Sequence, residues 1–253
     1  MNRSVRNILL PTLTFMVVLA AWQGVATLQI YSDHLFPSPL AVAQGVRELF
    51  QSGELWQYVW VSMLRFAAGY GVAALVALPL GLLFGRCLVL WSALDPLLQV
   101  LRPVSPIAWF PLISLWFGIG NLPAVVIIFL AAFYPILLST VAAVRNVPQV
   151  YLKVAGNFGA SGRKTLWDVI VPAAFPQITV GLHIAIGSAW VFLVAGEMLG
   201  VRSGLGYLII DSRNNLRTDL VIVGIILIGL SGLLIDRLVG AVERWAKRQW
   251  GVT

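Results

Sequence analysis

The chain has 253 residues, of which 59% are hydrophobic and 11% are charged, and its formal net charge is +7. Roughly a quarter of the residues in a soluble domain are charged, so this composition excludes an ordinary soluble domain and favours a polytopic α-helical membrane protein. The single cysteine excludes an internal disulfide and argues against a cysteine-rich metal site. The positive charge does not require a nucleic-acid partner, because loop arginines and lysines set the topology of membrane proteins.

The long apolar segments predict six transmembrane helices, and the strands of alternating polarity that an outer-membrane barrel needs are missing from the sequence. In chain order, we expect the spans near residues 8–28, 56–84, 91–117, 124–144, 175–199 and 219–239. Shorter helical or apolar pieces are expected in two loops, near residues 42–50 and 205–210. The predicted fold class is therefore an all-α polytopic membrane protein.

The third predicted span is interrupted in its middle, where Arg102 is followed by Pro103, Pro106 and Pro111. Proline has no backbone N–H and breaks a helix. Irregular backbone at membrane depth is tolerated only where it packs against protein or lines a watery cavity. We therefore expect one of these two environments at the break.

Six spans place both chain ends on the same side of the membrane. With both termini in the cytoplasm, the outer loops hold only Arg47, Arg202, Arg213 and Arg217, whereas eleven of the 17 lysines and arginines lie in inner segments. This bias satisfies the positive-inside rule. We divide the chain into an N-terminal span with a periplasmic loop (1–55), a transmembrane domain (56–242) and a basic cytoplasmic tail (243–253).

The longest polar interruption in the second half of the chain, residues 147–172, predicts a short amphipathic helix at 148–159. Pro148 suits a first helical turn, and Gly159 can take the left-handed conformation that ends a helix. Tyr151, Val154 and Phe158 recur at helical spacing on one face, and Ser161 can cap a second helix. An apolar stripe on a cytoplasmic helix needs a partner groove, although a connector lying on the membrane surface is the alternative.

The same stretch resembles the cytoplasmic loop of permease subunits of bacterial ABC importers, which reads EAA, three residues, Gly, nine residues and I-x-L-P. The closing residues are matched by 169–172, and Lys153 places a positive charge where the family has Glu. In this family the loop helix docks into a cleft of a separate ATPase subunit. The resemblance therefore assigns ATPase coupling to Tyr151, Lys153, Val154, Ala155, Phe158 and Gly159.

Further motifs resemble the nitrate, sulfonate, taurine and bicarbonate branch of these permeases. They are LFPSP (35–39), SGELW (52–56), DPLLQVLRPVSPIAWFPL (95–112), WFGIG (116–120) and AGEMLGVRSGLGYLI (195–209). The resemblance implies a type I importer fold of six helices around a half-pore in the bacterial inner membrane, with two copies forming one pathway for a small anion. It also implies two ATP-binding cassette subunits, which hold the ATP and Mg, and a periplasmic or lipid-anchored substrate-binding protein. No cofactor is expected on this chain.

No catalytic machinery is recognisable in the sequence, so the chain is not expected to be an enzyme. The segment GNFGASGRKT ends like a phosphate-binding loop, but Phe158 and Arg163 stand where that motif needs glycine. His183 has no second ligand at a suitable spacing, which favours a hydrogen-bonded packing role over a metal site.

Charged residues inside the spans cost free energy, so they pair or face water. Arg102 and Arg65 are therefore candidates for an anion pathway, with a structural pair to Glu197 as the alternative. Trp109 is a candidate gate residue or an interfacial anchor. The candidate pathway residues are Arg102, Trp109, Arg65 and Glu197.

A self-contained channel or secondary transporter is the alternative function. Secondary transporters show internal repeats with matching broken helices, whereas only the third span is broken here. The apolar stripe at 148–159 would also have no role in such a protein.

Overall fold

The computed structural model describes residues 3–30, 32 and 34–249, and within these ranges the chain is helical with no strand. The elements in order are α1 (Arg3–Thr27), α2 (Pro39–Gln51), α3 (Glu54–Arg86), α4 (Leu88–Leu101), η1 (Pro106–Trp109), α5 (Phe110–Phe117), α6 (Asn121–Arg145), α7 (Gln149–Asn157), α8 (Gly162–Thr165), η2 (Leu166–Ile170), α9 (Val171–Gly200), α10 (Leu205–Asn214) and α11 (Thr218–Gln249). The predicted all-α class is confirmed. Residues 1–2 and 250–253, where the chain ends were expected in the cytoplasm, lie outside the described residues.

Five helices of the described chain are long and apolar enough to cross a membrane, and α4 with η1–α5 makes a sixth if this pair, bent by 84°, counts as one broken span rather than a re-entrant loop. The bend falls at the predicted break, because Pro103 and Pro106 interrupt the helical hydrogen bonds there. The helix expected after Ser161 and the fifth span expected from residue 175 are joined without a break. Helical structure begins at Gly162 and passes through the π-helical turn η2 before Pro172, whose missing N–H disturbs the regular hydrogen-bond pattern.

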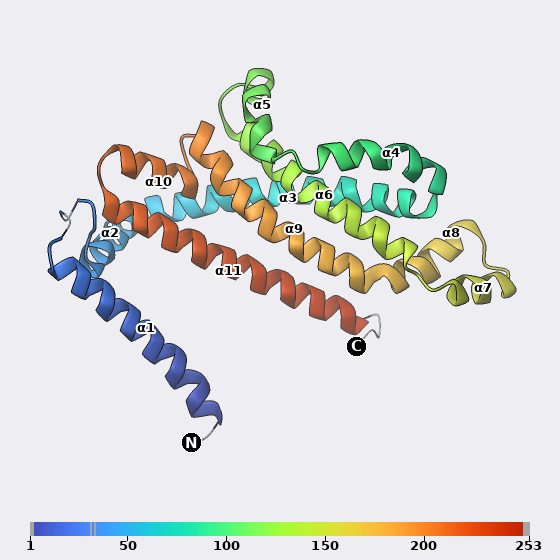
Figure 1. The fold of residues 1–253 in the computed structure, drawn as a ribbon, viewed down its shortest axis with the longest axis horizontal. Coiled ribbons are helices and arrows are strands. Elements are labelled where there is room, and N and C mark those ends of the chain that lie inside the picture. The colour runs from blue at the N-terminus through green and yellow to red at the C-terminus, as the bar shows by residue number, and fades with distance from the viewer. Residues whose placement is uncertain (1–2, 31, 33, 250–253) are drawn as a thin grey trace.

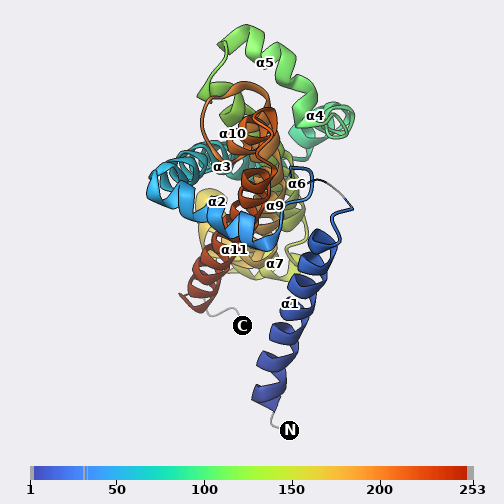
Figure 2. The same ribbon diagram turned by 90° about the vertical axis from the view of Figure 1, so that its left-hand side faces the viewer.

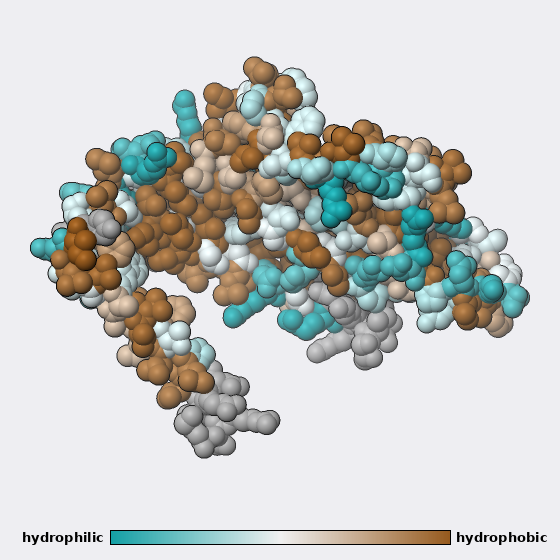
Figure 3. All heavy atoms as spheres, viewed as in Figure 1, coloured by the Kyte–Doolittle hydropathy of each residue, from teal (hydrophilic) through white to brown (hydrophobic). Residues whose placement is uncertain are grey.

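The body of the molecule is built on α6, which packs along α3 on one side and along α9 on the other. Figure 1 shows these long helices side by side, with α11 running along α9 and α5 standing out at the top. Helix α1 leaves the body and extends away from it in both ribbon views (Figures 1 and 2). Its surface is strongly apolar and uncovered (Figure 3), as expected for a helix whose surroundings are lipid or another protein chain.

Close packing of α3 on α6 depends on a stripe of small residues at every fourth position of α3. The stripe consists of Gly69, Ala73, Ala77, Gly81 and Gly85, and residues at this spacing share one helix face. A Cβ atom at position 81 would lie 2.5 Å from the Thr140 side chain, and one at position 69 would lie 2.7 Å from Ile128. Such small residues let two backbones approach closely inside a membrane.

The α2 helix and the start of α11 are joined by Arg217, which precedes α11. Its Nη2 donates to Glu48 Oε2 on α2 (2.7 Å) and to Asp219 Oδ2 (2.8 Å). The hydrogen bond from Arg217 lowers the pKa of the Glu48 carboxyl, which keeps this side chain ionised. This cluster holds α2 against the start of α11.

We predict that Gly81→Ala destabilises the protein whereas Gly71→Ala does not. A Cβ at position 71 meets no atom within 4 Å, so alanine there gains helix propensity, by up to about 1 kcal/mol. The same methyl group at position 81 would overpack the α3–α6 contact, at a cost of about 1–3 kcal/mol. Thermal unfolding of the purified variants in detergent, followed by size-exclusion chromatography, measures the difference. Equal melting temperatures for the two variants would contradict the proposed role of the stripe.

Candidate functional site

Arg65 and Glu197 form an ion pair in the interior, between the N-terminal half of α3 and the C-terminal end of α9. The distance from Arg65 Nη1 to Glu197 Oε1 is 2.6 Å, and the two residues are only 4% and 1% exposed. Arg65 also donates to Asn121 Oδ1 on α6 through Nε (3.0 Å) and Nη2, and to the carbonyl and hydroxyl oxygens of Ser203 (2.7 and 2.8 Å). Its fork of donors is thus fully used by side chains and backbone of the protein.

The Glu197 carboxylate is equally well surrounded. Ser62 Oγ lies 2.8 Å from both of its oxygens, and the Gly206 N–H donates to Oε2 (2.9 Å). Ser62 Oγ in turn accepts the N–H of Leu205 (2.8 Å). The network therefore binds the first turn of α10, where a negative charge is favourable, to α3 and α9.

The backbone before α10 is shaped to fit this network. Gly204 has φ +106°, and a Cβ there would fall against the Glu197 carboxylate and the Arg65 guanidinium. Only glycine can adopt this positive φ without strain and also leave room for the two side chains. Of the two roles left open for Arg65, the structure places it in the structural pair with Glu197.

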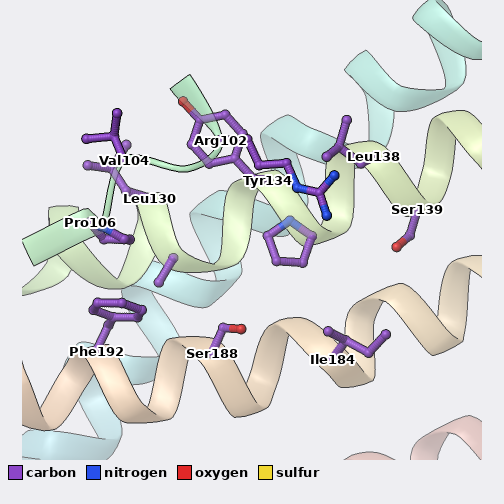
Figure 4. A pocket seen from close by; sticks show the side chains of 12 residues that line it. Arg102, Val104, Pro106, Leu130, Tyr134, Leu138, Ser139, Ile184, Ser188 and Phe192 are labelled. Atoms are coloured by element: carbon purple, nitrogen blue, oxygen red, sulfur yellow. The ribbon is translucent and has the colours of Figure 1, made fainter. Parts of the chain in front are cut away.

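Arg102 has a different environment, at a cavity of about 350 Å³ beside the break in the bent span (Figure 4). The cavity is lined by residues of the break, of α6 and of α9: Arg102, Val104, Pro106, Leu130, Ala131, Tyr134, Pro135, Leu138, Ser139, Ile184, Ser188 and Phe192. Arg102 is exposed and forms no salt bridge within the described part of the chain. The cavity thus combines one free cation with three hydroxyl groups in an apolar wall, and these groups can all donate hydrogen bonds to an anion.

A second cavity, of about 480 Å³, adjoins the first and shares Arg102 and Leu138 with it. Its polar lining comes from Asp95, Gln99 and Arg102, which share one face of α4 at positions i, i+4 and i+7. Gln99 Nε2 donates to Asp95 Oδ2 (2.8 Å). The two cavities therefore lie next to each other along α4 and α6, and Arg102 belongs to both.

Trp109 lies half-buried in η1 and lines neither of these cavities. His183 Nε2 lies 2.8 Å from Asp236 Oδ1, which joins α9 to α11. This contact agrees with the packing role expected for His183.

Sequence reasoning missed several polar residues that line the cavities. For Asp95 and Gln99 a signal existed, since their spacing relative to Arg102 marks one polar face on an otherwise apolar helix. For Tyr134, Ser139 and Ser188 the sequence gives no signal, because single hydroxyl groups occur throughout transmembrane helices.

The short helix predicted after Pro148 is α7, and one side of it packs on the body. Ala155 is buried, and Leu152 packs on an apolar cluster that includes Val147 and Ile170. Gly159 has φ +74° and ends the helical region as predicted. Ser161 occupies the N-cap position of α8, but its side chain makes no capping hydrogen bond.

Beside this buried side, α7 and its C-cap residue carry an exposed apolar surface made by Tyr151, Val154 and Phe158. Their exposed fractions are 52%, 47% and 86%, and Lys153 beside them is exposed as well. We call these three residues the α7 stripe. Because no described part of the chain covers it, the stripe is free to contact another protein.

The long apolar helices, the cavity beside the bend and the exposed α7 stripe together indicate a membrane protein with a surface available to another protein. Residues 54–248 match the family "Binding-protein-dependent transport system inner membrane component", and the chain belongs to this family. It is thus a multi-pass inner-membrane protein and a transport permease. This membership excludes the self-contained channel or secondary transporter.

Three relatives show the branch of the family. The chain is 35% identical to the taurine transport system permease protein of Escherichia coli (strain K12), over 94% of this chain and 89% of the relative. It is 35% identical to the nitrate import permease protein of Leptolyngbya laminosa, over 95% and 88% of the two chains. It is 36% identical to the bicarbonate transport system permease protein of Synechococcus elongatus (strain ATCC 33912), over 96% and 90%. The predicted resemblance to this branch is confirmed.

A solved structure supports the fold assignment. The MetNI methionine ABC transporter in an inward-facing conformation superimposes with a TM-score of 0.59, covering 76% of this chain and 97% of the other, at 19% identity. The predicted type I importer permease fold is confirmed by this likeness, which concerns the fold alone.

We predict that Arg65→Leu or Glu197→Leu alone destabilises the protein far more than the two changes together. Removing one partner leaves a buried charge without compensation, which costs about 3–5 kcal/mol. Replacing both by apolar residues removes both charges, so the double variant should regain much of the lost yield. The measurement is the monodisperse yield after detergent extraction.

The exposed Arg102 provides the matched control, since Arg102→Leu removes an arginine that has no buried partner and should leave the yield unchanged. Strictly additive losses in the double variant would show that Arg65 and Glu197 act independently.

Proposed function

We propose that two copies of this chain form the translocation pathway of an ATP-driven importer for a small oxyanion. The observation that carries the proposal is Arg102, a cation without a salt-bridge partner in the described chain, at the edge of a cavity beside the broken span. A charge at such a site costs free energy unless it faces water or a ligand. The nitrate, bicarbonate and taurine permeases among the relatives are named for substrates that carry a negatively charged oxygen-rich group.

A second copy completes the pathway in this proposal. Helix α4, which carries Asp95 and Gln99 and is followed by Arg102, has no buried residue, and both cavities are open to the surface. A second permease copy facing these cavities would convert two open half-pathways into one enclosed route. Arginine in such a route lowers the barrier for an anion, and the nearby carboxylate of Asp95 disfavours tight binding, which would slow release.

The α7 stripe couples the permease to a separate ATP-binding cassette subunit on the cytoplasmic side. Two such subunits would hold the ATP and Mg, and a substrate-binding protein would deliver the anion from outside. The support is the exposure of these apolar side chains on a helix whose neighbouring side packs on the body. An apolar helical face of this kind fits a groove on a partner. Both chain ends lie in the cytoplasm in this topology.

We predict that Arg102→Gln slows anion uptake at least about tenfold in reconstituted vesicles, which corresponds to about 1.4 kcal/mol of barrier. Arg102→Lys should recover part of the rate, because the charge remains but the planar fork is lost. Binding of the ATPase subunit should be equal in all three proteins, as a co-purification control. Uptake by the glutamine variant at the wild-type rate would exclude Arg102 from the pathway.

We predict that Val154→Asp weakens association with the ATPase subunit about tenfold or more. Burial of one such side chain contributes about 1.5–3 kcal/mol, and an aspartate in its place cannot be buried cheaply. Gln149→Asp places the same charge on the same helix away from the α7 stripe and serves as the control. Co-purification and ATP-driven uptake are measured for both variants. Wild-type behaviour of Val154→Asp in both assays would reject the coupling role of the α7 stripe.

A further inference from the structure

A third cavity, of about 810 Å³, lies between the end of α3 and the η2–α9 segment, and it shares no lining residue with the two polar cavities. Its wall is almost wholly apolar, with Leu78, Leu82 and Leu83 from α3 facing Leu166, Trp167 and Phe175. We call it the α3–α9 groove. Leu83 and Trp167 are about half exposed, so the groove opens on the outer surface of the molecule. Its size lies within the range of ligand-binding pockets.

One end of the α3–α9 groove is basic. Arg86 belongs to the lining, and its exposed side chain makes one hydrogen bond, from Nη1 to the Gly162 carbonyl (2.9 Å). That bond brings α8 beside it, with the exposed side chains of Arg163 and Lys164. The acidic residue nearest in sequence is Asp168 on η2, so three cations at this end are opposed by one carboxylate. An apolar groove with a cationic mouth matches a ligand with a hydrocarbon tail and a negative head.

We propose that the α3–α9 groove binds an anionic phospholipid, with an acyl chain between α3 and α9 and the phosphate at Arg86, Arg163 and Lys164. The groove is in the part of the protein that spans the membrane, and its basic end is next to α7, where the inner leaflet ends in the proposed topology. The placement of the head group therefore rests on the proposed function. Arginine and lysine near the cytoplasmic surface attract anionic lipids, and Trp167 is of the type that anchors at the lipid–water boundary.

Charge also argues against the uncovered helix α1 of a second copy as the occupant. Helix α1 contains no acidic residue and begins with Arg3 and Arg6. In the proposed topology this end lies on the same side of the membrane as Arg86. Two clusters of positive charge would then face each other at the mouth of the groove. A lipid phosphate at the same place would instead neutralise the positive charge of the groove.

A lipid in the α3–α9 groove would touch the support of α7. Leu78, Leu82, Leu166 and Leu182 line the groove or pack beside it, and they also pack on the apolar cluster that holds Leu152 of α7. The bound lipid would thereby stiffen the base on which the α7 stripe is presented. We therefore expect that a protein which retains more anionic lipid in the groove also couples more strongly to the ATPase subunit through the α7 stripe.

The test uses Cys87, the single cysteine of the chain, which lines the α3–α9 groove. The rate of its alkylation by N-ethylmaleimide is measured in micelles containing either dioleoyl phosphatidylglycerol or dioleoyl phosphatidylcholine. The anionic lipid should slow alkylation several-fold relative to the neutral one. Arg86→Gln should require about fivefold more phosphatidylglycerol for the same protection, because each basic side chain near the head group contributes about that factor.

Lys164→Gln provides a second variant, with a smaller shift expected, in case Arg86→Gln does not fold. Arg213→Gln removes an exposed arginine of α10 and is the matched control. In this variant phosphatidylglycerol should protect Cys87 from alkylation as well as it does in the wild type. Equal alkylation rates in the two lipids would overturn the proposal. Cys87 that stays unreactive in both lipids would also overturn it, because protein would then cover the groove.

The alkylation assay requires neither an ATPase subunit nor transport. Head-group-dependent protection together with normal coupling by Val154→Asp would reject the coupling role of α7 and leave the lipid site intact. Impaired coupling by Val154→Asp without head-group dependence would reject the lipid site alone.

Discussion

The close approach of α3, α6 and α9 is the constraint on which the rest of the structure depends. In a bilayer the hydrophobic effect does not drive helices together, so association relies on van der Waals contact between closely packed surfaces. The stripe from Gly69 to Gly85 permits that contact on the α3 side of α6, and Gly196 packs beside Ala124 on the α9 side. Only at this spacing can side chains of α3 and α9 reach each other across the outer end of α6.

The two arginines inside the spans show how the same residue type serves two purposes. Arg65 is enclosed by Glu197, Asn121 and Ser203, so its charge is neutralised and it fixes α10 to the core. Arg102 follows the last turn of α4, a helix without a buried residue, and its charge remains available in the cavity. The difference arises because Arg65 belongs to the tightly packed α3–α6–α9 core, whereas the α4–η1 bend lies at its edge.

The uncovered surfaces of α1, α4 and α7 differ in character, and each suits a different environment. Helix α1 is apolar over residues 9–27 and extends from the body, α4 bears a polar face beside the cavities, and the α7 stripe is exposed on a short helix outside the long ones. A single copy of this chain cannot satisfy all of these surfaces. The fold therefore describes one part of an assembly, in agreement with a family of multi-subunit transport systems.

The sequence by itself determined the features that depend on local rules. The lengths of the apolar segments predicted the spans, and the prolines after Arg102 predicted the bend. Helical periodicity, together with a glycine at position 159, predicted α7. The helix expected after Ser161 and the span expected from residue 175 are one continuous helical stretch from Gly162 to Gly200, which the local pattern did not join. Only the tertiary structure decided the partner of Arg65, since Glu197 lies 132 residues away and no local pattern connects them. The tertiary structure likewise decided which hydroxyl groups line the cavity. In a uniformly apolar helix, the packing of neighbouring helices determines which side chains point toward a cavity, and the sequence of that helix alone does not.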